Sequence, residues 1–181
     1  MNILVYIMSI GKHANKIMIH KSNLDDANQG LFAKKMFHKG ERVCEYAGYI
    51  KDKTEMVDLY QRNFEEYTKH HIYVRDLDID RVIIGSHLLA EEDMFKSGVY
   101  VNDGACLDLT ITYNPNIHRD IIDDYVNNSR LKQNVEAIVE DDKIYYVATK
   151  RIKKGEEFYA HYGKHYWLLL SGIPAEQLCE F

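Results

Sequence analysis

The sequence predicts a mostly β protein with a small helical insert and a short helical tail. Short runs dense in Ile, Val and Tyr recur along the chain, and polar turn-forming residues separate them. The apolar period changes once, after Thr54, to the spacing of an amphipathic helix. With 46% hydrophobic residues, 10 Gly and 2 Pro among 181 residues, the composition is that of a globular chain that can fill a core.

The expected strands before the helix share a high density of β-branched and aromatic residues. They are residues 1–10, 17–20, 30–37 and 42–50. A polar, turn-rich segment at 21–29 and a tight turn at His38–Glu41 separate them.

The helical insert is expected over about residues 54–69. Its apolar positions follow the spacing i, i+4, i+8 and i+11, and they are Met56, Tyr60, Phe64 and Tyr67. Thr54 is a plausible N-cap, and the acidic residues Glu55 and Asp58 favour the first turn.

After the insert, the chain returns to β-like alternation. Residues 71–86 alternate around a polar turn, 98–113 form another β-rich stretch, and 114–125 are turn-like. The motif Glu140–Lys143 predicts a hairpin, and a second turn is expected at residues 153–156. A short helical tail is expected near residues 168–178.

Charge and cysteine usage exclude several classes. The chain has 23 Lys+Arg against 28 Asp+Glu, a net charge of −5, and no long basic run, so we expect no direct binding of nucleic acid. The apolar opening is too short to span a bilayer and lacks the features of a signal peptide. The 3 Cys form no C-x-x-C pair, and the paired histidines offer no third ligand on the same element, so no metal site is expected.

Several segments are informative through their order and spacing. They are Gln29–Ala33, Lys39–Glu41 with Val43–Gly48, Tyr100–Asp103, Val147–Ile152 with Gly155–Glu157, and Tyr162–Gly163 with Tyr166–Trp167. Together they resemble the SET-domain family of protein-lysine methyltransferases, over about residues 17–167. The resemblance implies the SET-domain β-clip fold, a set of small curved sheets whose C-terminal segment passes through a loop as a pseudoknot.

The resemblance also sets the expected organisation. We expect a single domain over residues 1–181, with a SET core at about 17–167, the helical insert inside it, a further insertion at about 104–128, and a C-terminal tail at 168–181.

Two departures from the family pattern bear on the cofactor site. Asn28 stands where the family has the first Gly of its G-x-G motif, and Asp103-Gly104 stands where it has His-Ser. Asn134 then corresponds to the family's distal Asn. A second alignment uses Asn127-Asn128-Ser129 as the adenine-binding Asn element, and we prefer Asn102-Asp103 because it directly follows the preceding β-rich segment.

The resemblance implies S-adenosylmethionine as the cofactor and S-adenosylhomocysteine as the product. Tyr162 matches the family's catalytic tyrosine, and Tyr46 matches the tyrosine that lines its lysine channel. The residues that match cofactor-binding positions are Asn28, Gln29, Gly30, Leu31, Asn102, Asp103, Tyr162, Tyr166 and Trp167. The indole of Trp167 is expected to stack on adenine, and no dedicated catalytic base is expected.

The function expected from the resemblance is methyl transfer to a lysine side chain of a protein or peptide, with a histone tail as the expected substrate. The expected location is intracellular, in the nucleus if the substrate is chromatin and otherwise in the cytoplasm. No membrane association is expected. The sequence is compatible with a homodimer. At Ala160 and Ala137 the pocket lacks hydroxyls that would limit methylation, so di- or trimethyl-lysine is expected. Two alternatives stay open: a catalytically silent SET-like module that binds proteins, and an unrelated β protein in which Tyr162, Tyr46 and Trp167 lie far apart.

Overall fold

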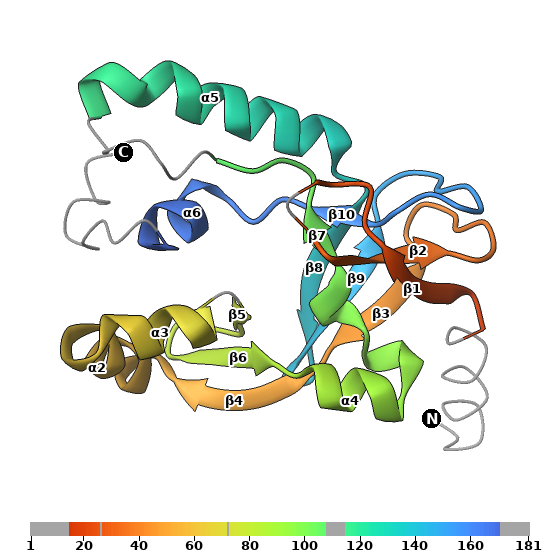
Figure 1. Cartoon of the computed structure of the whole chain (residues 1–181). Helices are drawn as coiled ribbons and strands as arrows, with labels where there is room; N and C mark the ends of the chain where they lie inside the picture. Colours follow the sequence, from red (N-terminus) through yellow and green to blue (C-terminus); the bar gives the residue numbers. More distant parts are fainter. Residues whose placement is uncertain (1–14, 26, 72, 108–114, 171–181) are drawn as a thin grey trace.

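The computed structural model describes residues 15–170 except 26, 72 and 108–114 (Figure 1). Its strands form small sheets of two or three strands rather than one large sheet. The prediction of small sheets with few helices is therefore confirmed. The strand expected at residues 1–10 and the helical tail beyond residue 170 lie outside the described residues.

Two of the sheets contain the N-terminal strands of the expected core. Strand β1 (Ile17–Lys21) pairs antiparallel with β2 (Gln29–Ala33). In the second sheet, β3 (Arg42–Tyr46), β9 (Lys143–Ala148) and β8 (Val135–Glu140) lie side by side in that order. The predicted hairpin at Glu140–Lys143 is confirmed: Asp141 and Asp142 both have positive φ, as a two-residue type I′ turn requires.

The third sheet carries the helical insert. Strand β4 (Gly48–Asp52) pairs with β6 (Arg81–Gly85), which pairs on its other side with β5 (Val74–Asp76). Between β4 and β5 the chain forms α2 (Lys53–Arg62) and α3 (Phe64–His71).

The prediction of one helix is corrected to two, because Asn63 leaves the helical conformation and its side-chain oxygen accepts the Glu66 N–H at 3.1 Å, which caps α3. The N-cap of α2 is Asp52, so Thr54 lies inside the helix.

The segment after residue 97 differs from its prediction. Residues 98–113 were expected to be β-rich, but Gly98–Tyr100 form the 3₁₀ turn η2, and within the described part of this stretch, 98–107, only Asn102–Asp103 form a strand, β7. The reason is close packing of the turn on β3, since a Cβ at Gly98 would lie 2.6 Å from the Tyr46 Cα atom. Before this turn lie α4 (His87–Glu92) and the 3₁₀ turn η1 (Met94–Lys96).

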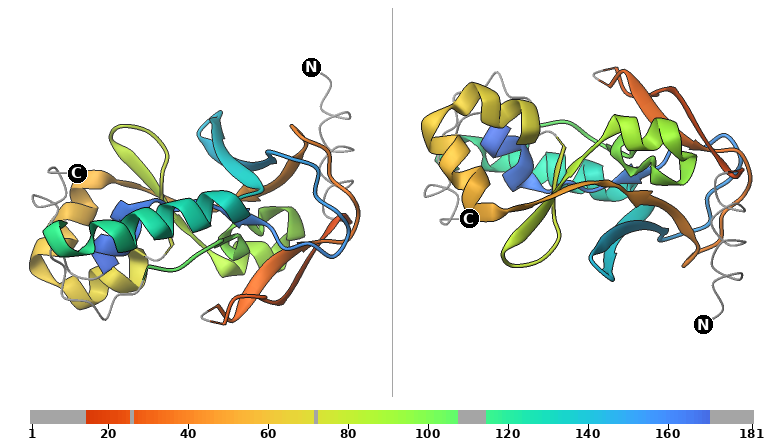
Figure 2. Two further views of the ribbon diagram at one scale, coloured as in Figure 1. Left: turned by 90° about the horizontal axis from the view of Figure 1, so that it is seen from above. Right: turned by 90° about the horizontal axis from the view of Figure 1, so that it is seen from below.

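The prediction of turns at 114–125 was wrong, because residues Pro115–Lys132 form helix α5. Proline suits the first position of a helix. Ile122, Tyr125 and Ser129 are buried at helical spacing, which gives the helix an inward face. Helix α5 lies over α6 (Lys164–Leu170), and α6 lies between α5 and the α2–α3 pair (Figures 1 and 2).

The C-terminal segment is enclosed by three other parts of the chain. On one side the Phe158 N–H donates to the Leu31 carbonyl of β2 at 2.8 Å. On another side strand β10 (Tyr159–Ala160) pairs in parallel with β7. The side chain of Asn134 accepts from the Tyr159 N–H at 2.8 Å and donates to the Glu157 carbonyl at 2.7 Å. This enclosed segment matches the expected pseudoknot, and it leads directly to Tyr162.

Candidate active site

Two cavities meet at a wall formed by Arg75, Tyr162 and Tyr166, because these three residues line both. The first, here named the Asn102 cavity, has a volume of about 860 Å³ and lies among the loop before β2, strand β7 and helix α6. The second, the Met56 cavity, has a volume of about 760 Å³ and lies among α2, α3, β5, α5 and α6.

Most of the residues predicted to bind the cofactor line the Asn102 cavity. They are Asn28, Gln29, Asn102, Asp103, Tyr162, Tyr166 and Trp167. Gly30 and Leu31 lie behind this lining. A Cβ at Gly30 would lie 2.0 Å from Glu157 Oε1, so only glycine fits there, and Leu31 is fully buried in the core. Any contact of Gly30 and Leu31 with a ligand would come from their backbone.

Both candidate Asn elements reach the Asn102 cavity, since Asn128 of α5 also lines it. The two differ in their connections. The Asn102 side-chain nitrogen donates to the Gln29 carbonyl at 2.9 Å and lies 3.2 Å from Glu157 Oε1. Asn102 therefore joins the strand that pairs with β10 to the start of β2 at Gln29, which favours the Asn102-Asp103 alignment.

Asp103 organises the end of the Asn102 cavity. Its carboxylate is 4% exposed, and Oδ2 accepts the Tyr162 backbone N–H and the Trp167 indole N–H, both at 3.1 Å. The same carboxylate accepts the hydroxyls of Tyr125 and Ser129 from α5. The aspartate that departs from the family pattern thus fixes the positions of Tyr162 and Trp167.

A second buried carboxylate, which sequence reasoning did not single out, supports the other end of this cavity. Glu157 is 2% exposed and accepts hydrogen bonds from the Ser22 hydroxyl at 2.7 Å, the Asn23 N–H at 2.8 Å and the Tyr159 hydroxyl at 2.8 Å. These contacts tie the loop between β1 and β2 to the enclosed C-terminal segment. The only sequence signal was its place in the Gly155–Glu157 motif.

Tyr162 stands at the junction of the two cavities. Its hydroxyl donates to the Val101 carbonyl at 2.6 Å, and its ring meets the Tyr166 ring edge-on at 4.8 Å. Burial raises the pKa of Tyr162 well above its ordinary value, although the neighbouring Arg75 charge opposes this. The phenol is therefore neutral at physiological pH.

Tyr46 is 2% exposed and lines neither cavity, but its ring contacts Arg75 at the junction. Its hydroxyl donates to the Tyr73 carbonyl at 2.6 Å, and burial raises its pKa. A Cβ at Gly85 would lie 2.5 Å from this hydroxyl, so the strand beside it must carry glycine. The structure brings Tyr46 and Tyr162 together, because both rings face the Arg75 guanidinium, at 5.4 and 3.8 Å from its central carbon.

Sequence reasoning missed two residues of this junction. Arg75 of β5 lies over the tyrosine rings, and its Nε lies 3.5 Å from the hydroxyl of Tyr146, a fully buried residue of β9. Arg75 stands in a charged hairpin without a motif, so the sequence carried no signal for it. Tyr146 follows Tyr145 in a strand, and only three-dimensional packing shows which ring points to the site.

Two signatures are absent from the ranges that the structure describes, those of a metal centre and of a membrane-spanning helix. No group of three or more His, Cys, Asp and Glu side chains gathers there to hold a metal ion. None of the helices found within those ranges is long and apolar enough to cross a membrane.

Comparison with protein families identifies one match. The family model for the SET domain matches residues 28–163, which include all the predicted site residues except Tyr166 and Trp167. A comparison with curated proteins gave no significant match.

Comparison with solved structures gives the same fold. The polycomb repressive complex 2 of Chaetomium thermophilum matches with a TM-score of 0.50, 22% identity and 82% of this chain covered. The same complex in an autoinhibited conformation bound to S-adenosylmethionine matches with a TM-score of 0.51, 22% identity and 91% coverage. This chain spans 15% and 16% of those chains, respectively.

Proposed function

Because this chain belongs to the SET-domain family, we propose that it is a protein-lysine N-methyltransferase that uses S-adenosylmethionine. The observation that carries the proposal is the position of Tyr162. Its ring lines both the Asn102 cavity and the Met56 cavity, so one residue adjoins the sites of both reactants. Transfer of a group between two separately bound ligands needs such a junction.

The Asn102 cavity fits the cofactor in size and chemistry. Its volume of about 860 Å³ lies within the range of ligand pockets. Its lining supplies polar groups at Asn28, Gln29 and Asn102 for an amino acid and a ribose, and the aromatic ring of Trp167 for a purine. When bound, S-adenosylmethionine would supply an electrophilic methyl group on a positively charged sulfur.

The chain's own residues would position the lysine amine and exclude water from it. The hydroxyls of Tyr46 and Tyr162 each donate a hydrogen bond to a backbone carbonyl, which fixes both phenols in place. The amine must be neutral to attack, and free lysine has a pKa near ~10.4. Exclusion of water and the positive charge of a bound cofactor would both lower that pKa, so no histidine or carboxylate base is required.

For the substrate we propose a lysine in a basic protein segment, with a histone tail as the first candidate. The net charge of −5 suits a basic partner. The Met56 cavity, lined by residues such as Met56, Tyr60 and Tyr67, is where the peptide around the lysine would lie. A histone substrate would place the enzyme in the nucleus; another protein substrate would place it in the cytoplasm.

Labelled S-adenosylmethionine and a panel of core histones test the proposal directly. We expect transfer of label to at least one histone, and binding of S-adenosylhomocysteine by calorimetry. Binding without transfer to any protein would favour the silent SET-like module instead. Absence of both binding and transfer would refute the enzyme.

The number of methyl groups added is a finer proposal. Ala160 and Ala137 supply no hydroxyl, which favours di- or trimethyl-lysine as the product. The buried hydroxyl of Tyr146 near Arg75 opposes this, and sequence reasoning did not count it. Mass spectrometry at long incubation decides: a wild-type product that stays monomethylated, and that gains methyl groups in Tyr146→Phe, would assign the limit to that hydroxyl.

A further inference from the structure

The Arg75 guanidinium lies among three tyrosine rings at the junction of the cavities. Its central carbon is 3.8 Å from the centroid of the Tyr162 ring, 5.4 Å from that of Tyr46 and 5.5 Å from that of Tyr166. Distances within about 6 Å are those of cation–π contacts. A group of several aromatic rings around one cation is an aromatic cage, the kind of site that binds ammonium ligands. Here a side chain of the same protein occupies the cage.

The other contacts of Arg75 make this position unusual for an arginine. Its Nη1 donates to the Val74 carbonyl at 2.7 Å, and Nε reaches the Tyr146 hydroxyl at 3.5 Å. Among the residues that the structure describes, no carboxylate forms an ion pair with it. Within that part of the chain, the positive charge is therefore balanced by ring faces and neutral oxygens.

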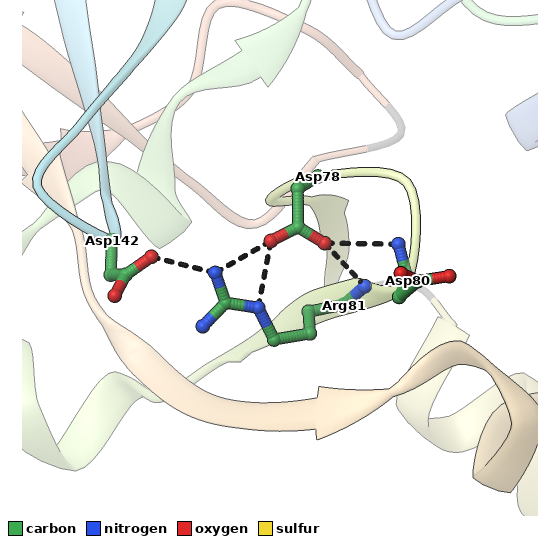
Figure 3. Close-up of polar contacts among 4 residues, drawn as sticks. All are labelled: Asp78, Asp80, Arg81 and Asp142. Carbon is green, nitrogen blue, oxygen red and sulfur yellow. Dashed lines mark hydrogen bonds and ion pairs between the residues drawn. The ribbon is translucent and has the colours of Figure 1, made fainter.

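The next strand supplies the comparison. Arg81 of β6 donates to the carboxylates of Asp78 and Asp142, at 2.7 Å in each case (Figure 3). Asp78 also accepts the Asp80 N–H at 2.9 Å, which closes the turn of the hairpin (Figure 3). One hairpin thus carries an arginine with carboxylate partners, facing outward, and an arginine with tyrosine partners, inside the cage.

Arg75 also lies at a position from which its side chain can leave the cage. It belongs to β5, a strand of 3 residues that pairs only with β6 and so forms the edge of its sheet. Arginine has a long side chain with several rotatable bonds, and its guanidinium is always charged. Withdrawal from the cage therefore needs only a change of rotamers, while the hairpin stays closed by Arg81.

We propose that Arg75 is an internal competitor of the substrate lysine: it fills the tyrosine cage until a lysine side chain displaces it. The proposal rests on the proposed function for the identity of the incoming group. Two cations cannot share the cage, because their repulsion there is not screened by water. Arg75 therefore admits only substrates whose flanking residues bind strongly enough to displace it.

The first test observes occupancy without any activity. In ¹H–¹⁵N spectra of the wild-type protein, the Arg75 Nε–H signal, assigned by its loss in Arg75→Lys, should be shifted by the tyrosine rings and exchange slowly with water. A signal at the ordinary position of a solvated arginine would overturn the proposal.

The second test measures competition. Initial rates are compared for wild type, Arg75→Ala and the matched control Arg81→Ala, with a histone substrate of varied concentration and saturating S-adenosylmethionine. We expect Arg75→Ala to lower KM for the histone at least fivefold, and calorimetry with S-adenosylhomocysteine checks that the variant folds and binds the cofactor. Arg81→Ala should leave KM unchanged.

A KM in Arg75→Ala that is unchanged or higher, with cofactor binding retained, would overturn competition and make Arg75 a positioning residue for Tyr162. Failure of the proposed function gives a different result, namely a wild-type chain that neither binds the cofactor nor transfers methyl groups. The ring-shifted Arg75 signal can still be measured in such a chain, because it does not depend on activity.

Discussion

Removal of the Tyr162 hydroxyl separates the chemical role of this residue from its structural role. In Tyr162→Phe the ring keeps its contacts with Arg75 and Tyr166, and only the oxygen at the junction of the cavities is lost. That oxygen donates to the carbonyl of Val101, a residue with 0% exposure. The variant thus leaves a buried carbonyl without this donor.

The expected loss of stability follows from that hydrogen bond. An unsatisfied buried carbonyl costs about 1–3 kcal/mol, against a typical total stability of about 5–15 kcal/mol. The variant should therefore fold, with a lower urea midpoint. The expected loss of activity is larger in effect: a group that contacts the reacting atoms is worth about 10²- to 10³-fold in kcat.

The assay combines labelled methyl transfer, calorimetry with S-adenosylhomocysteine and urea unfolding. Tyr49→Phe is the matched control, because Tyr49 is a tyrosine of β4 with 59% exposure and lies away from the junction. Tyr162→Phe should lose transfer while cofactor affinity stays within a few-fold of wild type. Near wild-type turnover in a folded variant would refute the assignment of Tyr162 as catalytic.

The remaining predictions address the cofactor, the channel and alkaline stability. S-adenosylhomocysteine should quench or shift the fluorescence of Trp167, and Trp167→Phe should weaken its binding about threefold to tenfold; calorimetric binding without any spectral change would place the indole outside the ligand. Gly85→Ala would bring a Cβ to 2.5 Å from the Tyr46 hydroxyl. Methyl transfer should therefore fall about tenfold or more while cofactor affinity is kept. An equal loss of transfer and of cofactor affinity would contradict this prediction. Burial raises the pKa of Tyr67 to about 12. Between about pH 10 and 12, the unfolded chain therefore loses a proton that the folded chain keeps. The free energy of unfolding should fall in that range by up to about 1.4 kcal/mol per pH unit because of this residue. Urea titrations in that range should give a shallower fall for Tyr67→Phe, and identical slopes would count against it.

The sequence allowed prediction where one local pattern decides the structure. The hairpin at Asp141-Asp142 is local, because two residues that tolerate positive φ stand between two β-like runs. The proximity of Tyr162 and Trp167 was predictable because they belong to one ordered set of motifs, and the structure joins them through the carboxylate of Asp103.

Prediction from the sequence failed where tertiary contacts determine the structure, or where composition was given more weight than apolar spacing. Helix α5 was missed because its polar composition was read as a turn, although the spacing of Ile122, Tyr125 and Ser129 is helical. Arg75 could not be predicted, because its neighbours come from β3 and the C-terminal segment, and no local pattern relates them.

Asp103 and helix α5 depend on each other. An imidazole has two ring nitrogens and, when neutral, can accept only one hydrogen bond, whereas a carboxylate can accept about four. Here five groups donate to Asp103: the Ala105 N–H, the Tyr162 N–H, the Trp167 indole, and the hydroxyls of Tyr125 and Ser129. The last two come from α5, so a histidine at this position would leave most of these buried donors without an acceptor. The departure from the family's His-Ser and helix α5 therefore belong together, since the helix supplies the donors that a buried aspartate requires and the aspartate holds Tyr162 at the junction of the two cavities.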